Sequence, residues 1–190
     1  MQYISRIDAN APGPASETLA AVKKKLGAVP NIFATLANSP AALESYLAFT
    51  AALDKGLLSK ALREQIALAV AGANECDYCA SAHTFIAKSL GVDAVEAARN
   101  LAAESAKPKT AVILEFVADV VNNRALLADN AGALDDLRHA GVTDAEIVEI
   151  IANIAVNIFT NYFNHVAGTD IDFPAVDSKA HKAQANSSQT

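Results

Sequence analysis

The sequence contains few of the residues that interrupt helices or cross-link a chain. Its 190 residues include six prolines, two cysteines and no tryptophan, and aromatic residues make up 6% of the total. A low proline content together with abundant alanine favours helices. With 52% hydrophobic residues, a chain of this length can bury a substantial core. We therefore expect one packed domain, in which two cysteines are more often catalytic or metal-binding than a structural bridge.

The chain also lacks an excess of positive charge. Its 15 basic and 21 acidic residues give a net charge of −6, and no basic stripe is present, so we do not expect nucleic acid as a partner. No uncharged apolar run reaches the ~20 residues of a membrane span, and the first residues do not resemble a signal peptide. These features predict a cytoplasmic protein that does not enter the membrane.

No segment shows the alternation of apolar and polar residues that is typical of strands, so the sequence predicts an all-α fold. The helix from 16 to 26 would have Ser16 as its N-cap and Gly27 as its stop, and Thr143 and Glu146 predict a capping box. The other helices are expected over 31–39, 40–53, 59–73, 76–90, 93–102, 109–122, 130–139 and 143–164. Residues 1–174 would form the domain, and the polar segment 175–190 is expected to be disordered.

Two segments of the chain resemble each other weakly. Five positions between 59 and 78 recur 84 residues later as identical or similar residues. The pairs are Ser59 and Thr143, Ala61 and Ala145, Ile66 and Ile150, Ala71 and Ala155, and Tyr78 and Tyr162. This similarity has two possible explanations. One is an internal duplication of a helical hairpin, and the other is chance agreement between alanine-rich helices.

Both cysteines lie in one short stretch, at Cys76 and Cys79, with a histidine at position 83. In a helix that begins near Cys76, Cys79 and His83 would stand one turn apart on the same face. Cys76 would then lie at the helix N-terminus, where unpaired N–H groups and the helix dipole favour a thiolate. This spacing indicates a redox or metal site.

A glutamate on the preceding helix completes the candidate site. Glu64 lies twelve residues before Cys76, and Gly72, Ala73 and Asn74 are suited to end its helix and turn the chain back. The resulting hairpin would bring the Glu64 carboxylate to the thiol and imidazole, directly or through one water. On its own, such a glutamate would more often face solvent.

The pattern Glu-x11-Cys-x2-Cys-x3-His, formed by Glu64, Cys76, Cys79 and His83, resembles the active-site signature of the AhpD-like alkylhydroperoxidases within the carboxymuconolactone decarboxylase family. The resemblance covers roughly residues 20–174. It extends to the segments 29–33, 38–41, 58–64 and 161–166. It implies an AhpD-like helical fold and an enzyme with peroxidase activity.

The resemblance also implies a role for each residue. Cys79 would attack an organic hydroperoxide, His83 would accept its proton and Glu64 would orient His83, without a cofactor or metal. Cys76 would resolve the resulting sulfenic acid as a disulfide, which an external dithiol or lipoyl-type reductant would reduce. The helix N-terminus alone favours Cys76 as the more acidic thiol. The histidine four residues further along favours Cys79, and contact geometry takes priority over acidity.

Other interpretations remain open at this point. Cys76, Cys79, His83 and Glu64 could together hold zinc, although structural zinc usually supports domains without a core. The two cysteines could also be buried residues without chemistry, or a redox sensor for a partner protein. Decarboxylation of a γ-lactone is the other activity of the family, but the decarboxylases generally lack the paired cysteines.

Three further residues are secondary candidates. Some relatives have a second histidine where this chain has Tyr78, which alters the proton relay. His165 and Asn161, together with Asn164, lie near the end of the last predicted helix. We interpret these three as helix-capping groups in preference to pocket-lining groups.

The helices over 59–74 and 143–164 are apolar around most of their circumference, which requires burial on several sides. Two such helices in a domain of this size suggest contact with another subunit. We therefore expect a homo-oligomer, and the resemblance favours a trimer or hexamer.

Overall fold

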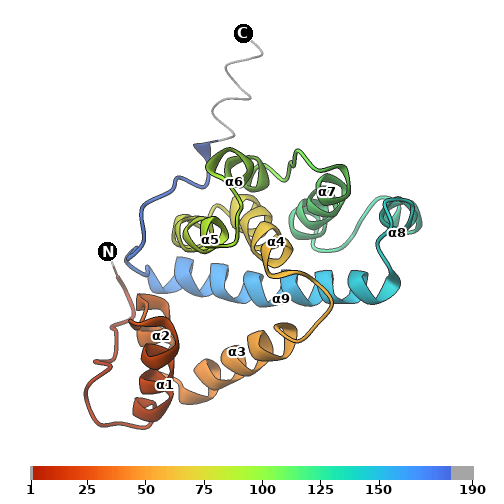
Figure 1. Cartoon of the computed structure of the whole chain (residues 1–190). Helices are drawn as coiled ribbons and strands as arrows, with labels where there is room; N and C mark the ends of the chain where they lie inside the picture. Colours follow the sequence, from red (N-terminus) through yellow and green to blue (C-terminus); the bar gives the residue numbers. More distant parts are fainter. Residues whose placement is uncertain (1, 181–190) are drawn as a thin grey trace.

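The computed structural model describes residues 2–180, and within that range the chain forms nine α-helices and no strands (Figure 1). The helices are α1 (Ser16–Leu26), α2 (Asn31–Leu36), α3 (Pro40–Leu53), α4 (Lys60–Ala73), α5 (Asp77–Ser89), α6 (Ala94–Leu101), α7 (Pro108–Asn122), α8 (Asn130–His139) and α9 (Asp144–Ala167). The predicted all-α fold is confirmed. None of these helices is both long and apolar enough to cross a membrane.

Local capping signals account for most helix ends. Ser59 accepts a hydrogen bond from the Leu62 N–H at the start of α4, and Thr143 and Glu146 form the predicted capping box at the start of α9. The prediction for Ser16 was wrong, because Ser16 is the first residue of α1 and its side chain caps nothing. The turn closed by the Ser16 N–H and the Gly13 carbonyl starts the helix one residue earlier.

The long helix α9 extends three residues beyond its predicted end at 164. Gly168, with a φ of 61°, ends it, and the Gly168 N–H donates to the Asn164 carbonyl. Because α9 is one continuous helix, the segment that echoes the α4–α5 hairpin does not itself form a hairpin. The predicted internal duplication is therefore not confirmed.

Helix α4 lies at the centre of the fold and packs against α5, α6, α7 and α9 (Figure 1). Its residues 65–72 are all buried, which explains why this helix is apolar on nearly every side. Gly72 lets α4 approach α6 closely, since a Cβ atom at this position would collide with the Leu101 carbonyl oxygen.

Two hydrophobic clusters lie on different sides of α4. The cysteine-side cluster contains Leu68 and Ala71 of α4 together with Cys76 and Cys79. The α7-side cluster is built from apolar side chains of α4, α7 and α9. Its members include Ile66, Val70, Ile113, Leu114, Val117, Ile147, Ile150 and Ile154. Helix α4 thus supports the candidate site on one side and a purely apolar core on the other.

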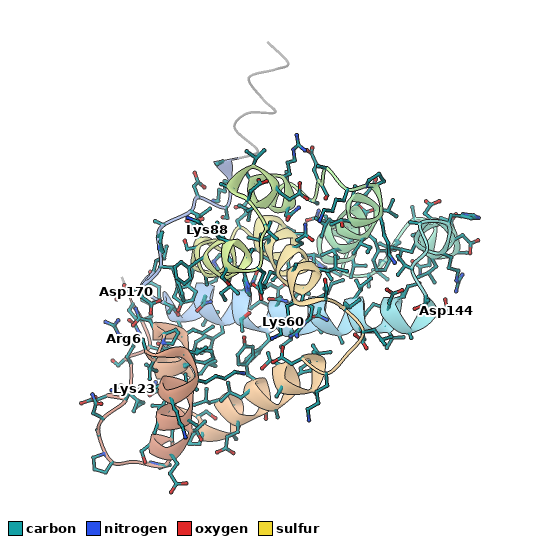
Figure 2. All side chains as sticks on the ribbon, viewed as in Figure 1. Arg6, Lys23, Lys60, Lys88, Asp144 and Asp170 are labelled. Atoms are coloured by element: carbon teal, nitrogen blue, oxygen red, sulfur yellow. A yellow bond between two sulfur atoms is a disulfide. The ribbon has the colours of Figure 1, made fainter. Side chains whose placement is uncertain are left out.

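Both ends of the described chain are attached to the helices. Near the N-terminus, Arg6 forms an ion pair of 3.6 Å with Asp170, directly after α9 (Figure 2). The chain after α9 then runs past α5 towards α6 (Figure 1). Along this path Ser178 donates two hydrogen bonds to Oδ1 of Asp77, the first residue of α5, through its N–H and its hydroxyl, at 3.0 and 2.6 Å. Ordered contacts therefore extend past the predicted boundary at 174, and residues 181–190 lie outside the described part.

Candidate active site

The turn between α4 and α5 places the two cysteines. Glu75 adopts a φ of 56°, and the Cys76 N–H donates to the Ala71 carbonyl at 3.0 Å, which folds the chain back tightly after α4. Cys76 is the N-cap of α5, and its sulfur accepts a hydrogen bond from the Cys79 N–H at 3.3 Å. The predicted hairpin, with its second helix beginning at Asp77, is confirmed.

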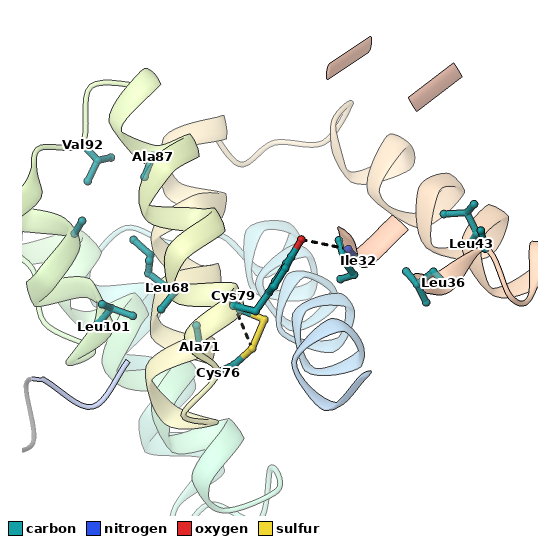
Figure 3. Close-up of a cluster of buried hydrophobic side chains, with 14 of the residues drawn as sticks. Ile32, Leu36, Leu43, Leu68, Ala71, Cys76, Cys79, Ala87, Val92 and Leu101 are labelled. Carbon is teal, nitrogen blue, oxygen red and sulfur yellow. Dashed lines mark hydrogen bonds between the residues drawn. A yellow bond between two sulfur atoms is a disulfide. The ribbon is translucent and has the colours of Figure 1, made fainter. Parts of the chain in front are cut away.

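Cys76 and Cys79 are joined by a disulfide, with their Cα atoms 5.3 Å apart (Figure 3). Both residues are buried, each with 2% of its surface exposed. Asn164 of α9 donates a hydrogen bond from Nδ2 to Cys79 Sγ at 3.3 Å. The pair therefore lies where the start of α5 meets the last part of α9.

Glu64 and His83 form the second pair in the site. His83 Nδ1 and Glu64 Oε2 are 2.7 Å apart, and each side chain is 19% exposed. A carboxylate only accepts hydrogen bonds, so Nδ1 is the donor, and whenever the imidazole is neutral Nε2 is its basic nitrogen. Because α5 is continuous from Asp77 to Ser89, His83 lies one turn after Cys79 on the same face.

Cys79, Glu64 and His83 all line one cavity of about 570 Å³. Much of the remaining wall consists of apolar side chains. They include Val22, Leu26, Ile32, Phe33, Leu47, Phe85, Ile86 and Phe173. A mostly apolar cavity with a few convergent polar groups is typical of a site for a small organic molecule.

Two tyrosines, buried Tyr78 and half-buried Tyr46, line this cavity and remain neutral at ordinary pH. Burial, and to a lesser extent the negative charge of Glu64, raises the pKa of Tyr46 to about 12. Burial also raises the pKa of Tyr78, and the nearby carboxylate of Asp172 contributes to the same shift. The Tyr78 hydroxyl accepts a hydrogen bond from the Ile32 N–H at 3.2 Å. Tyr78 therefore anchors α2 to α5 at the edge of the site.

The other two secondary candidates contact the α4–α5 turn and do not line this cavity. Asn161 is fully buried, and its Oδ1 accepts a hydrogen bond from Asn74 Nδ2 at 3.3 Å. His165 is exposed, and its Nε2 lies 2.8 Å from the Asn74 carbonyl oxygen. These side chains hold the turn that carries Cys76, which differs from the capping role that the sequence predicted.

Asn164, which contacts the cysteine sulfur, was predicted only as a helix-capping residue. A pattern in the sequence could have indicated its role, because asparagines occur at positions 153, 157, 161 and 164 of a largely apolar helix. All four are buried. Polar residues at this helical spacing form a stripe along one side of the helix, and Asn153, Asn157 and Asn164 line the cavity.

The four residues proposed as zinc ligands are arranged as two separate pairs. The sulfurs are bonded to each other, and His83 is hydrogen-bonded to Glu64. Within residues 2–180, no group of three or more histidine, cysteine, aspartate or glutamate side chains is placed to hold a metal ion.

Comparisons with known proteins agree with this architecture. Residues 40–119 match the model of the carboxymuconolactone decarboxylase family. A search of curated proteins finds no match. The chain is similar to the structure of an alkylhydroperoxidase AhpD core, an uncharacterized peroxidase-related protein from Ralstonia eutropha JMP134. The identity is 27% and the TM-score 0.78, with 90% of this chain and 94% of that chain covered.

Two other solved structures share the fold. An uncharacterized peroxidase-related protein from Silicibacter sp. TM1040 is 24% identical, with a TM-score of 0.77 and coverage of 88% of this chain and 90% of that chain. The debrominase Bmp8 in complex with 2,3,4-tribromopyrrole is 18% identical, with a TM-score of 0.76 and 97% of both chains covered. At these identities the likeness concerns the fold alone.

Proposed function

We propose that this chain, whose residues 40–119 match the carboxymuconolactone decarboxylase family, is a thiol-dependent peroxidase that reduces organic hydroperoxides to alcohols. One observation carries the proposal: the Cys76–Cys79 disulfide adjoins a cavity of about 570 Å³ that the hydrogen-bonded Glu64–His83 pair also lines. The site thus combines a group that exchanges electrons with a group that exchanges protons, beside apolar walls suited to an organic substrate.

In the oxidising half-reaction, His83 Nε2 accepts the Cys79 thiol proton, and Glu64 stabilises the resulting imidazolium through Nδ1. The Cys79 thiolate attacks the terminal peroxide oxygen and the O–O bond breaks. The leaving alkoxide takes a proton from His83 and departs as the alcohol, while Cys79 becomes a sulfenic acid. The peroxide is reduced by two electrons and the sulfur is oxidised by two.

The cycle then requires the second cysteine. The Cys76 thiol gives up its proton and its sulfur attacks Cys79 Sγ. The sulfenic hydroxyl takes that proton and leaves as water, and the Cys76–Cys79 disulfide forms. An external dithiol, for which a lipoyl group is the model, returns both cysteines to thiols and is itself oxidised to a disulfide. A reducing compartment such as the cytoplasm suits this cycle.

Cys79 is the better candidate for the attacking sulfur, although Cys76 occupies the helix N-terminus. Cys79 lines the cavity together with His83, and Cys76 does not line it. Asn164 also donates a hydrogen bond to Cys79 Sγ. His83, a base one helical turn away in the same cavity, and the hydrogen-bond donor Asn164 both favour Cys79 as the nucleophile.

Peroxide turnover with dithiothreitol or dihydrolipoamide tests the proposal. We expect catalytic consumption of cumene hydroperoxide, abolished in Cys79→Ser and strongly reduced in His83→Ala. His139→Ala, at the last residue of α8, is the matched control and should retain activity. After peroxide treatment, Cys76→Ser should carry a dimedone-reactive sulfenic acid on Cys79. Labelling confined to Cys76 in Cys79→Ser would reverse the assignment.

Two results would favour the alternative functions. Oxidation that stops after one equivalent of peroxide, despite excess reductant, indicates a redox sensor. Release of CO2 from carboxymuconolactone, unchanged when both cysteines are replaced by serine, indicates a decarboxylase.

We further propose that the protein is a homo-oligomer, with a trimer or hexamer preferred. The proposal is supported by one face of α9, where five apolar side chains between 42% and 72% exposed follow helical spacing. They are Val148, Ile151, Phe159, Tyr162 and Val166. Contiguous exposed apolar residues of this kind mark contact surfaces. Light scattering at micromolar concentration should give a multiple of 19.8 kDa, and a monomer mass would refute the proposal.

A further inference from the structure

The Cys76–Cys79 disulfide lies between two cavities. The cavity of about 570 Å³ is lined by Cys79 and not by Cys76. A second cavity, of about 410 Å³, is lined by Cys76 and not by Cys79. Tyr78 and Asn164 line both cavities. Each sulfur-bearing residue therefore borders a different space.

The second cavity has a different chemical character from the first. It lies between the α4–α5 turn, the last turn of α9 and residues 168–171. Its described lining contains three carboxylates, Glu75, Asp77 and Asp170, and no lysine or arginine. Lys179 and Arg6 pair with Glu75 and Asp170, at 3.0 and 3.6 Å, from outside this lining. Two carboxylates are thus paired with cations and Asp77 remains, so the lining is weakly acidic and favours a neutral molecule over an anion.

Two buried polar atoms of residues that line this cavity lack a partner within the described chain. Thr169 is 8% exposed and Asn164 is 5% exposed, and Thr169 Oγ1 and Asn164 Oδ1 have no hydrogen-bond partner there. Buried polar groups are normally satisfied, so such atoms call for an explanation. Because each atom has almost no accessible surface, a molecule in the cavity reaches it only when neighbouring side chains move.

We propose that this second cavity admits the thiol reductant, a neutral dithiol, and that the reductant attacks Cys76. The inference rests on the proposed peroxidase cycle and assigns its two substrates to opposite sides of the disulfide. In thiol–disulfide exchange the attacking thiolate forms a mixed disulfide with one sulfur and expels the other. A thiolate in the second cavity reaches the side of the disulfide that Cys76 occupies, and Cys79 is then the leaving group.

The exchange balances as two displacements. The first reductant thiolate bonds to Cys76 Sγ, the Cys76–Cys79 bond breaks, and Cys79 leaves as a thiolate, which the hydrogen bond from Asn164 Nδ2 stabilises. A better stabilised thiolate is a better leaving group. The second reductant thiolate then attacks the reductant sulfur in the mixed disulfide and expels Cys76. The reductant is oxidised to a disulfide, and the protons of its two thiols end on Cys76 and Cys79.

Two isoleucines of similar exposure allow the cavities to be tested separately. Ile171 lines the second cavity and is 40% exposed, whereas Ile86 lines the first and is 37% exposed. Stopped-flow measurements would follow reduction of the oxidised protein by dihydrolipoamide, and oxidation of the reduced protein by cumene hydroperoxide. Since exchange rates depend on access to the sulfur, we expect Ile171→Trp to slow reduction about tenfold and leave oxidation unchanged.

Ile86→Trp should give the opposite pattern, with slower oxidation and unchanged reduction. If Ile86→Trp slows reduction and Ile171→Trp does not, both substrates use the first cavity and the inference is refuted. Circular dichroism of both variants verifies that they are folded.

The site of attack can be identified directly. Oxidised protein is treated briefly with cysteamine, quenched with acid and N-ethylmaleimide, and sequenced by mass spectrometry. We expect cysteamine on Cys76 and maleimide on Cys79, and the reverse labelling would refute the inference. This reaction contains no peroxide, so its outcome is independent of the proposed peroxidase activity, which the turnover assay with hydroperoxide tests separately.

Discussion

The two halves of α9 pass through different surroundings. In the first half, Ile147, Ile150 and Ile154 are buried in the α7-side cluster. In the second half, the buried side chains include Asn157, Asn161 and Asn164, next to the disulfide and the α4–α5 turn. The first half therefore stabilises the fold by burying apolar side chains. The second half buries asparagines instead, which provide hydrogen-bonding groups at the candidate site.

The second half of α9, called the asparagine half below, does not destabilise the core through its buried amides, because most of these amides have hydrogen-bond partners. Asn157 and Asn164 donate from Nδ2 to the Asn153 carbonyl and to Cys79 Sγ, at 2.8 and 3.3 Å. Buried polar groups with partners contribute little net stability, whereas losing a partner is costly. We therefore expect substitutions in the two halves to separate into effects on stability and effects on chemistry.

The largest effect on stability is expected in the apolar half. Ile150 is fully buried in the α7-side cluster, so Ile150→Ala should lower the free energy of unfolding by about 2–5 kcal/mol through lost burial and a cavity. Urea denaturation measures this loss. Val95→Ala on α6, where the side chain is 66% exposed, should stay within about 0.5 kcal/mol. Equal losses in the two variants would contradict the assignment of the core to this half.

The next largest effect on stability is expected in α4, the helix that lies between the cysteine-side cluster and the α7-side cluster. Gly72→Ala places a Cβ atom against the Leu101 carbonyl oxygen, so α4 and α6 must move apart. Overpacking of this kind should cost about 1–3 kcal/mol of stability. Gly13→Ala, where a Cβ atom meets nothing within 4 Å, is the matched control. A Gly72→Ala protein as stable as the wild type would show that α6 can shift without loss.

In the asparagine half, Asn164→Ala should change chemistry more than stability. It removes the hydrogen-bond donor to Cys79 Sγ, so the thiolate forms less readily. Hydrogen bonds to charged groups contribute roughly 1.5–3 kcal/mol, which corresponds to a reaction with peroxide at least about tenfold slower. The pH–rate profile should also move to higher pH. Asn161→Ala, which removes only the contact with Asn74, should lose stability and keep the wild-type pH profile.

The smallest expected effect is electrostatic and lies at the rim of the larger cavity. A hydrogen bond from Arg63 holds the pKa of Asp54 below its ordinary value. The stabilisation is therefore complete above the unfolded-state pKa of about 4, and it is lost as the pH falls through the lower folded-state value. Asp54→Asn should cost at most about 1 kcal/mol at pH 7, because the carboxylate is partly exposed.

The difference between Asp54→Asn and wild type should shrink towards zero as the pH is lowered below 4. Asp119→Asn on the exposed side of α7 serves as the control and should show no such trend. A constant difference at all pH values would assign the Asp54 effect to packing.

The sequence predicted the helices well, because their ends depend on neighbouring residues. Ser59, and Thr143 with Glu146, are signals that act within one turn, and the structure contains each of them. The Glu64–His83 contact was also predictable, since a single tight turn connects their helices. Ser16 was misjudged, because the preceding turn at Gly13 competes with a cap for the start of the same helix.

Features that depend on distant packing were not predictable. The Asn164–Cys79 hydrogen bond joins residues 85 positions apart, and its formation requires that α9 cross the start of α5. The second cavity depends in addition on residues 168–171, which have no periodic pattern. The contacts of Ser178 with Asp77 likewise depend on where the chain runs after α9, and composition alone suggested disorder there.

The position of the disulfide between two cavities has a consequence for steady-state kinetics. A peroxidase that alternates between oxidised and reduced forms usually follows ping-pong kinetics. When both substrates use one opening, a high concentration of either blocks the other and inhibits turnover. In the proposed cycle the peroxide meets Cys79 and the reductant meets Cys76 from separate cavities, so neither substrate would obstruct the other. Turnover should then saturate without substrate inhibition, even at reductant concentrations far above those of the peroxide.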